Sequence, residues 1–372
     1  MPRRKLNLRG VIRATSSART GRMDNVGTVD RPAEALSDQV VGLVILDMDQ
    51  SELTLRCLRS IERGDVLPGW IVLVENGRDS VPLDGLSDIV RSRTTVLRPG
   101  HNLGCAGGRN LGVHFLRRNT STTRCVTLDN DIIVPEDFVR KIRSSVLPRL
   151  GVGAPVIESH PSGRVWSAGG RLGVRGRIDL VNSRDGLVGE HVDVDWVPGA
   201  CVVFDVPTWT HVGVFDEWMG FLFEDVDWCV RVRRHGGSIR LWPGITLRHE
   251  EHQSLGGSGS ARRAYLWSRN GTVLRSASLG LGWLDLGHWT LSQLRMALRE
   301  LLAGGPTIAI SRIAGLGHGH VESIRRRCSL ATRRPDPVRM RPSGRVMPGN
   351  GSQWSCGESS GGCEEREQRG PE

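Results

Sequence analysis

The chain has 372 residues, and its 38% of hydrophobic residues suffices for a core in one large domain or two smaller ones. The formal net charge of +10 favours a polyanionic neighbour, but does not choose among a nucleotide, an anionic lipid headgroup and nucleic acid. No part of the sequence has the roughly 18 uninterrupted apolar residues of a membrane helix, so the chain is not expected to cross a membrane.

The cysteines and the two ends of the chain bear on its compartment. The eight cysteines are scattered, without a CxxC pair or zinc-ligand spacing, which favours a reduced, cytoplasmic protein. Residues 1–39 are Arg-rich, also carry acids, and lack the apolar core of a signal peptide, so we predict a disordered basic arm in preference to an organelle transit peptide. Residues 331–372 are rich in Pro, Gly, Ser and acids, and predict a disordered tail.

The first part of the ordered region alternates strands with helices. A continuous apolar run over residues 40–46 predicts a buried strand, and Ser51 resembles the N-cap of a following helix. Further strands are predicted at residues 70–74, 94–97 and 125–128, and helices at residues 112–119 and 135–146. This alternation predicts an α/β protein with a mostly parallel, Rossmann-like sheet flanked by helices, whose ligand-binding loops follow the carboxyl ends of the strands.

The sequence changes character past Gly151. Short glycine-rich strands are predicted at residues 164–166, 173–178 and 192–196, as hairpins beside the sheet, and a buried strand within residues 197–206. Pro207 is expected to open a short helix. Further helices are predicted at residues 224–234, 262–279, 284–302 and 307–327, the last two as an amphipathic pair.

Asp129 and Asp131 flank Asn130 directly after the strand predicted at residues 125–128. Paired carboxylates at a strand end suit Mg²⁺ or Mn²⁺, ions that take few protein ligands and complete their shell with water and phosphate oxygens. The alternative is an Asx turn or a helix-capping pair ahead of Pro135.

A glycine-rich stretch, residues 101–112, lies between a predicted strand and a predicted helix. Glycines there would let the backbone approach a ligand closely, and the nearby polar side chains could reach phosphate or sugar hydroxyls. The GxGxxG spacing of a dinucleotide site is absent. The alternative is a helix start that needs glycine only for packing. The candidate ligand-binding residues of this stretch are Asn102, Gly104, Gly107, Gly108, Arg109 and Asn110.

Glu224 and Asp225 stand where a glycine- and aromatic-rich loop gives way to a helix. A carboxylate there could accept the proton of an attacking hydroxyl, with Phe221, Phe223 and Trp228 supplying an apolar setting. The alternative is that acids are simply favoured at a helix N-terminus.

His249 follows a predicted turn and strand that could return its imidazole to a metal. A lone histidine is more often structural, and His252 is a competitor three residues on.

Taken in order, these motifs resemble the inverting nucleotide-sugar glycosyltransferases of family 2, especially the rhamnosyl- and galactofuranosyltransferase-like branch. The resemblance covers roughly residues 40–274. It rests on residues 44–61, Leu73-Val-Glu-Asn-Gly77, Asn102–Gly112, Leu128-Asp-Asn-Asp131, Pro198-Gly-Ala-Cys201, Gly213-Val-Phe-Asp-Glu217, Phe223–Trp228, His249 and Arg269-Asn270.

The resemblance implies a GT-A fold and a divalent metal ion. By position, Asp131 looks like the direct metal ligand, Asp129 its partner near the ribose, and His249 the second protein ligand. Glu75 takes the place of the acid that usually contacts the nucleobase, although Asp is more frequent there. Asp225 takes the place of the general base. The first strand ends in Asp47-Met48-Asp49, where the family usually has a Thr-Tyr-Asn-like segment, so the nucleotide, UDP or dTDP, stays open.

The expected organisation is a nucleotide-sugar-binding half at residues 40–150, an acceptor and catalytic half at residues 151–280, and C-terminal helices at residues 281–330. The expected acceptor is the hydroxyl of a glycan, a lipid-linked sugar or a small molecule, and nucleic acid is not expected as a partner. The alternatives are a sugar-1-phosphate nucleotidyltransferase and an inactive carbohydrate-binding relative. The C-terminal helices could lie on the cytoplasmic face of an anionic membrane, pack on the core or form a homo-oligomer.

Overall fold

The computed structural model describes residues 39–250 and 260–331, with side chains to residue 328. Four apolar runs form the parallel part of its central sheet, and they lie in the spatial order β4, β1, β2, β3. Their bounds are β1 (Val41–Asp47), β2 (Trp70–Glu75), β3 (Thr94–Leu97) and β4 (Arg124–Asp129). The register pairs Asp47 with Glu75 and Leu46 with Asp129, so three acidic strand ends meet at one edge of the sheet.

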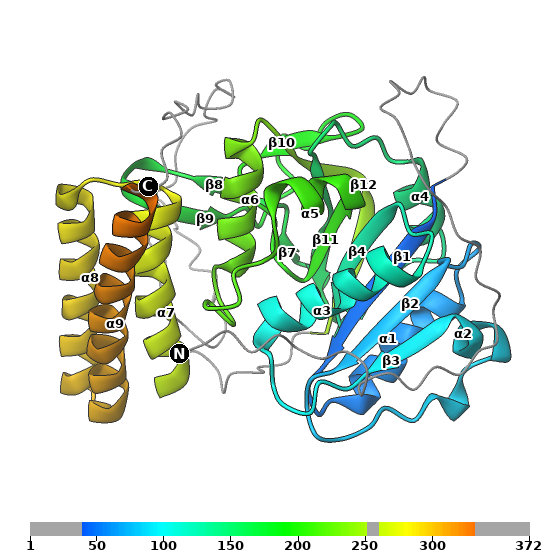
Figure 1. The fold of residues 1–372 in the computed structure, drawn as a ribbon, viewed down its shortest axis with the longest axis horizontal. Helices are drawn as coiled ribbons and strands as arrows, with labels where there is room; N and C mark the ends of the chain where they lie inside the picture. Colours follow the sequence, from blue (N-terminus) through cyan, green and yellow to red (C-terminus); the bar gives the residue numbers. More distant parts are fainter. Residues whose placement is uncertain (1–38, 251–259, 332–372) are drawn as a thin grey trace, which may run out of the picture.

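Helices cover both faces of this part of the sheet (Figure 1). Val44 and Leu46 of β1 belong to one apolar core, together with residues of α3 (Gly104–Asn119). Leu43 and Ile45 face the other way and pack in a second core with residues of α1 (Ser51–Glu62) and α4 (Phe138–Ser144). Burial on both faces explains why β1 is continuously apolar instead of alternating. A short helix, α2 (Asp88–Arg93), precedes β3, and Leu83–Gly85 is a 3₁₀ turn.

The second half of the chain extends the same sheet beyond β4. β11 lies antiparallel between β4 and β6, and β12 runs parallel to β6 at the far side, with β10 beyond it. The bounds are β5 (Ile132–Ile133), β6 (Val152–Ser159), β7 (Val165–Ser167), β10 (Val192–Val194), β11 (Cys201–Asp205) and β12 (Ile239–His249). A separate hairpin joins β8 (Gly170–Leu172) to β9 (Ile178–Leu180) through a 3₁₀ turn, Val174–Gly176.

Five helices complete the described fold. α5 (Val206–Val212) and α6 (Glu224–Arg234) lie on the second half of the sheet. α7 (Ala261–Val273) continues into a π-helical turn, Leu274–Ser278, and stands beside α8 (Trp283–Leu302) and α9 (Pro306–Ala331) at one end of the molecule (Figure 1). A side chain at Gly315 of α9 would place its Cβ 2.2 Å from the carbonyl oxygen of Tyr265, so glycine permits the close approach of α9 to α7. None of the described helices is long and apolar enough to span a bilayer.

Several predicted boundaries need correction. The helix predicted from residue 112 begins at Gly104, so most of the glycine-rich stretch is helical and not a loop. Most of the strand predicted at residues 173–178 is instead the connection between β8 and β9, and β9 begins at its last residue, Ile178. Gln50, not Ser51, precedes α1, and no side chain caps that helix. The predicted arm and tail lie outside the described residues, apart from their innermost positions, and the division into halves stays a prediction.

Candidate active site

The acidic edge of the parallel strands is ordered by local hydrogen bonds. Asp47 Oδ1 accepts a 2.6 Å bond from the Thr54 hydroxyl of α1, and burial raises the pKa of Asp47. Glu75, predicted to contact the nucleobase, is buried and accepts a 2.9 Å bond from the Val81 amide. Its other oxygen lies 2.5 Å from Arg98 Nε. Contacts within the protein therefore hold the carboxylates of Asp47 and Glu75 in place at this edge.

Asp131 and His249 come together through the pairing of two strands. β5 follows Asp131, and its Ile132 lies opposite His249 in the antiparallel register with β12. His249 Nε2 lies 3.2 Å from Asp131 Oδ1. Trp166 packs edge-on against the imidazole, with 4.6 Å between the ring centroids. The predicted pairing of an aspartate with a histidine from a remote part of the sequence is thus present in the structure.

These two side chains can act as metal ligands. Asp131 Oδ1 is buried and accepts no hydrogen bond within the described part of the chain. A separation of 3.2 Å matches the roughly 3 Å between neighbouring ligands on an octahedral ion with bonds of about 2.1 Å. Residues 39–250 and 260–331 contain no group of three or more His, Cys, Asp or Glu placed to hold a metal by themselves. A pair of protein ligands suits an ion that takes the rest of its shell from water and phosphate.

Arg109 connects the strand-end aspartate to the acidic start of α6. It projects from α3, is 2% exposed, and lies 2.9 Å from Asp129 and 2.7 Å from Glu224. Burial by itself would lower the pKa of the Arg109 guanidinium, but the carboxylates of Asp129 and Glu224 raise it overall. Arg109 therefore stays charged and holds carboxylates from two remote segments in one cluster.

Glu224 and Asp225 form the first turn of α6, where the helix dipole favours negative charge. Asp225 Oδ2 accepts a 2.8 Å bond from the Gly199 amide, and burial raises the pKa of Asp225. Burial, and after it the charge of Asp225, raises the pKa of Glu224 to about 7 despite the opposing effect of Arg109. The buried Glu224 Oε2 has no hydrogen-bond partner among the described residues. Two neighbouring carboxyls thus differ in environment, a common property of acid–base sites.

Gly199 permits these groups to meet. A side chain there would place its Cβ 2.6 Å from an Arg109 guanidinium nitrogen, so it would push the guanidinium from its position between the two carboxylates. The position stands in the Pro198-Gly-Ala-Cys201 motif, but its role depends on a contact that the sequence does not reveal.

The loop before α6 is held by two adjacent side chains of α7. The Asn270 amide donates 2.8–2.9 Å bonds to the carbonyls of Met219, Phe221 and Leu222. Arg269 donates to the carbonyls of Trp218 and Met219. The loop needs this support because Leu222 and Phe223 both have φ of 70°, a left-handed conformation that costs free energy for residues with a Cβ. Asn270 and Arg269 therefore fix the position from which Glu224 and Asp225 start.

Close packing explains why glycine occupies several positions of the glycine-rich stretch. A Cβ at Gly108 would lie 2.7 Å from a Leu46 methyl carbon of β1. Gly107 lies inside the same helix, and Gly104, with φ of 71°, lies against the Gly220 backbone. The helical packing that was the alternative explanation is therefore present. Contact between these glycines and a ligand remains a prediction.

The two asparagines of this stretch bond to protein groups. Asn110 donates 2.9 Å and 3.0 Å bonds to the Phe215 carbonyl and to Glu217, and accepts one from the Phe215 amide. Asn102 accepts a 2.7 Å bond from the Gly104 amide and a 3.2 Å bond from Asn76. Both side chains hold neighbouring loops, and their contact with a donor stays a prediction.

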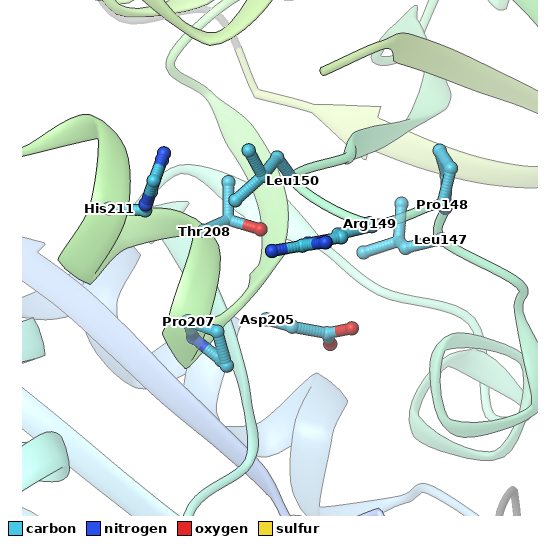
Figure 2. A pocket seen from close by; sticks show the side chains of 8 residues that line it. All are labelled: Leu147, Pro148, Arg149, Leu150, Asp205, Pro207, Thr208 and His211. Carbon is cyan, nitrogen blue, oxygen red and sulfur yellow. The ribbon is translucent and has the colours of Figure 1, made fainter. Parts of the chain in front are cut away.

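A cavity of about 300 Å³ lies away from these residues (Figure 2). Its lining residue Asp205 pairs with Arg124 in the β11–β4 register, at the opposite end of β4 from Asp129. Five residue steps along β4 (124 to 129) correspond to about 16 Å. The cavity therefore does not belong to the acidic cluster. It is lined by Leu147, Pro148, Arg149, Leu150, Asp205, Pro207, Thr208 and His211.

Comparison with known proteins identifies the family. A profile of the family described as "Glycosyltransferase like family 2" matches residues 39–269, and the chain belongs to this family. A curated relative, the low-salt glycan biosynthesis hexosyltransferase Agl10 of Haloferax volcanii, is 22% identical over 182 residues. That alignment covers 46% of this chain and 56% of the relative, so the chain spans little more than half the length of the relative.

Solved structures with a similar course of the chain include GalNAc-T7 with UDP, GalNAc and Mn²⁺, with a TM-score of 0.46 and 14% identity over 64% of this chain and 50% of that one. TarS of S. aureus gives a TM-score of 0.42 and 12% identity, covering 70% of this chain and 43% of that one. Its 1–349 fragment gives 0.41 and 11%, covering 77% and 91%.

The family match confirms the predicted enzyme class, a glycosyltransferase, and with the observed sheet it confirms the predicted α/β fold of the GT-A type. The resemblance to family 2 is confirmed at this level. The rhamnosyl- and galactofuranosyltransferase-like branch within this family stays a prediction.

Proposed function

We propose that the chain transfers a sugar from a nucleoside diphosphate donor, UDP- or dTDP-linked, to an acceptor hydroxyl. The observation that carries the proposal is the Arg109 bridge, which joins Asp129 at the end of β4 to Glu224 at the start of α6. Because Asp225 follows Glu224 directly, this bridge supports a shared site for the donor at the strand edge and the proposed base. The best-supported acceptors are a glycan, a lipid-linked sugar or a small-molecule alcohol, and a rhamnosyl- or galactofuranosyl-type donor is the finer expectation.

Asp225 is the proposed general base. Its carboxylate is fixed by the Gly199 amide, and the residue as a whole is half-buried, which supports access of an acceptor hydroxyl. As the hydroxyl oxygen attacks the anomeric carbon from the face opposite the leaving diphosphate, its proton passes to Asp225. A single displacement of this kind inverts the anomeric configuration.

Asp131 and His249, with Asp129 nearby, are the residues that would hold Mg²⁺ or Mn²⁺. When bound, such an ion neutralises negative charge on the leaving diphosphate. Arg109 stays paired with its two carboxylates, so its proposed role is to position Asp129 and Glu224 and not to contact the donor directly.

The rival activity is that of a sugar-1-phosphate nucleotidyltransferase. Such enzymes place a glycine-rich loop with a basic residue straight after the first strand. Here β1 leads into Asp47-Met48-Asp49, and Asp49 Oδ1 accepts bonds of 2.5 Å and 2.9 Å from the amides of Arg78 and Asp79. An acidic, internally bonded turn in this place favours the glycosyltransferase. Diphosphate release from a nucleoside triphosphate and a sugar phosphate would support the rival instead.

We propose a cytoplasmic location. The six described cysteines are all free thiols, which fits a reducing compartment.

The donor is tested first. The purified chain is screened by thermal shift against nucleotide sugars, with and without Mn²⁺, because selective stabilisation identifies a ligand of the folded state. With the donor so found, Asp225→Asn should keep donor binding and lower the transfer rate about 100-fold or more. Near-normal turnover of this variant would remove Asp225 from the proposed role, and a product of retained configuration would exclude the single displacement.

A further inference from the structure

The outer surface of α8 carries a row of leucines that no described part of the chain covers. These side chains are between 44% and 83% exposed and recur at helical spacing along one side of the helix. We call this row the leucine stripe, and it consists of Leu284, Leu291, Leu294, Leu298, Leu301 and Leu302. Single exposed leucines are ordinary on protein surfaces, whereas a continuous apolar row marks an interaction site.

The leucine stripe faces solvent, because the opposite side of α8 packs against the rest of the protein. Leu286, Trp289 and Ala297 are buried on that side. Trp289 Nε1 donates a 2.9 Å bond to the Thr272 hydroxyl of α7, and the Arg275 guanidinium lies over its ring at 3.6 Å from the centroid. These contacts fix the rotation of α8 about its axis and hold the stripe toward solvent.

The neighbouring helix α9 adds to this apolar surface. α9 packs against both α7 and α8, and its remaining side carries Ile310, Ile313, Val321 and Ile324, each at least 51% exposed. Figure 1 shows α8 and α9 side by side at the edge of the molecule, away from the central sheet. A partner on this side would therefore meet the helices and not the strands.

The charges of the two helices are distributed unevenly. Among the described residues of α8 and α9, each acid is at least partly buried and close to an arginine: Asp285 with Arg175, Glu300 with Arg312, and Glu322 with Arg325 and Arg326. Arg295 and Arg299, in contrast, are exposed and fall along one border of the leucine stripe, by the period of about 3.6 residues per turn. The charge accessible beside the stripe is therefore positive.

We propose that the leucine stripe docks on a membrane surface that contains anionic lipid. The leucines would enter the boundary between headgroups and acyl chains, and Arg295 and Arg299 would extend to the phosphates. The charge pattern distinguishes this occupant from a second copy of the chain. Two stripes packed face to face would bring arginines together, and the described residues of α8 and α9 offer no exposed acid to pair with them. The proposal concerns binding alone and does not depend on the transfer reaction.

Vesicle flotation of the full chain tests the proposal. We expect binding to vesicles of phosphatidylcholine with phosphatidylglycerol, weak binding to phosphatidylcholine alone, and weaker binding as salt rises. The double substitution Leu298→Gln/Leu301→Gln should lower the affinity about tenfold or more, because the apolar area that enters the bilayer is lost. Arg295→Gln/Arg299→Gln should lower it about tenfold on anionic vesicles.

Matched controls lie elsewhere on the surface. Val174→Gln/Val188→Gln replaces two apolar residues of 85% and 82% exposure, and Arg117→Gln/Arg118→Gln replaces two exposed arginines of α3. Neither pair should change flotation. Because every substituted residue is exposed, circular dichroism should show an unchanged helix content.

Three results would overturn the proposal. Unchanged flotation of the leucine variant would assign membrane binding to another part of the chain. Equal binding to neutral and anionic vesicles would remove the role of the arginines. Absence of vesicle binding, with a dimer by light scattering that the leucine variant converts to monomer, would show that a second copy covers the stripe.

Discussion

At each end of β4 a buried arginine lies next to a carboxylate, but the two groups differ in how completely their polar atoms are hydrogen-bonded. At its start, Arg124 pairs with Asp205 through two bonds of 2.8 Å and 3.3 Å and donates to the carbonyls of Ile142 and Ser145. At its end, Arg109 approaches Asp129 and Glu224, while its Nε and the Glu224 Oε2 have no partner within the described structure.

The difference separates a structural ion pair from a candidate site. One arginine meets one carboxylate at the start of β4, and every guanidinium nitrogen donates a bond there, which is the condition for a stable buried pair. At the other end one arginine faces Asp129, Glu224 and Asp225, with Asp131 two residues beyond. Surplus negative charge with unsatisfied atoms costs stability unless a cation shares the site, and it is typical of functional clusters.

The largest expected difference between the two ends of β4 concerns metal binding. Asp131→Asn should lower transfer about 100-fold or more and abolish stabilisation of the protein by Mn²⁺, because the buried oxygen proposed as a metal ligand is replaced by an amide. Asp205→Asn, at the other end of the sheet, should leave both unchanged. A thermal-shift assay with Mn²⁺ and a transfer assay measure the two effects. Full activity of the wild-type chain in excess chelator would contradict the metal requirement.

Conservative replacement of the two arginines sharpens the comparison. Arg109→Lys cannot hold two carboxylates in the same fork geometry, so kcat/KM should fall about tenfold as Asp129 and Glu224 shift. Arg124→Lys should lower the free energy of unfolding, by about 1–3 kcal/mol for the lost bonds to charged and carbonyl groups, and leave kcat/KM unchanged. Denaturant unfolding and steady-state kinetics on both variants give the answer. Equal losses of kcat/KM in the two variants would contradict the assignment of different roles to the two ends of β4.

Asn270 is expected to act on the reaction through the loop that it supports. Asn270→Ala removes the bonds to the left-handed segment before α6, so kcat should fall several-fold to about tenfold, with a smaller change in donor affinity. Asn119→Ala, which removes an exposed bond to the Phe115 carbonyl, is the control. Kinetics alongside donor binding separates a shift of Asp225 from a general loss of folding. Unchanged kcat in a folded Asn270 variant would exclude the positioning role.

The smallest expected effect is on the pH dependence of the free energy of unfolding. Burial and Asp225 raise the pKa of Glu224 from 4.5 to about 7, so the folded chain binds this proton more tightly than the unfolded chain. The contribution of Glu224 is therefore fully present below pH 4.5 and is lost as the pH rises through about 7. Glu224→Gln should flatten this part of the profile, measured by denaturant unfolding at several pH values. An unchanged slope in the variant would mean that another group titrates there.

Much of the fold could be predicted from local patterns. The apolar runs at residues 40–46 and 70–74 are strands, because a strand buried on both faces needs no alternation. α6 has the predicted bounds, since acids occupy its first turn and two glycines follow its end. The glycine-rich stretch was harder, because the packing of Gly108 against Leu46 belongs to the tertiary structure and leaves no local signal.

The sequence by itself determined which chemical groups the protein has to use: two aspartates after a strand, two acids at a helix start and a histidine after a turn. These depend on short-range propensities and charges, which neighbouring residues set. Only the tertiary structure decided which groups meet. The β5–β12 register brings His249 to Asp131, and α3 inserts Arg109 between Asp129 and Glu224. The contacts of His249 with Asp131 and of Arg109 with Glu224 join residues more than a hundred positions apart, and only the simultaneous packing of the sheet and both its faces selects them.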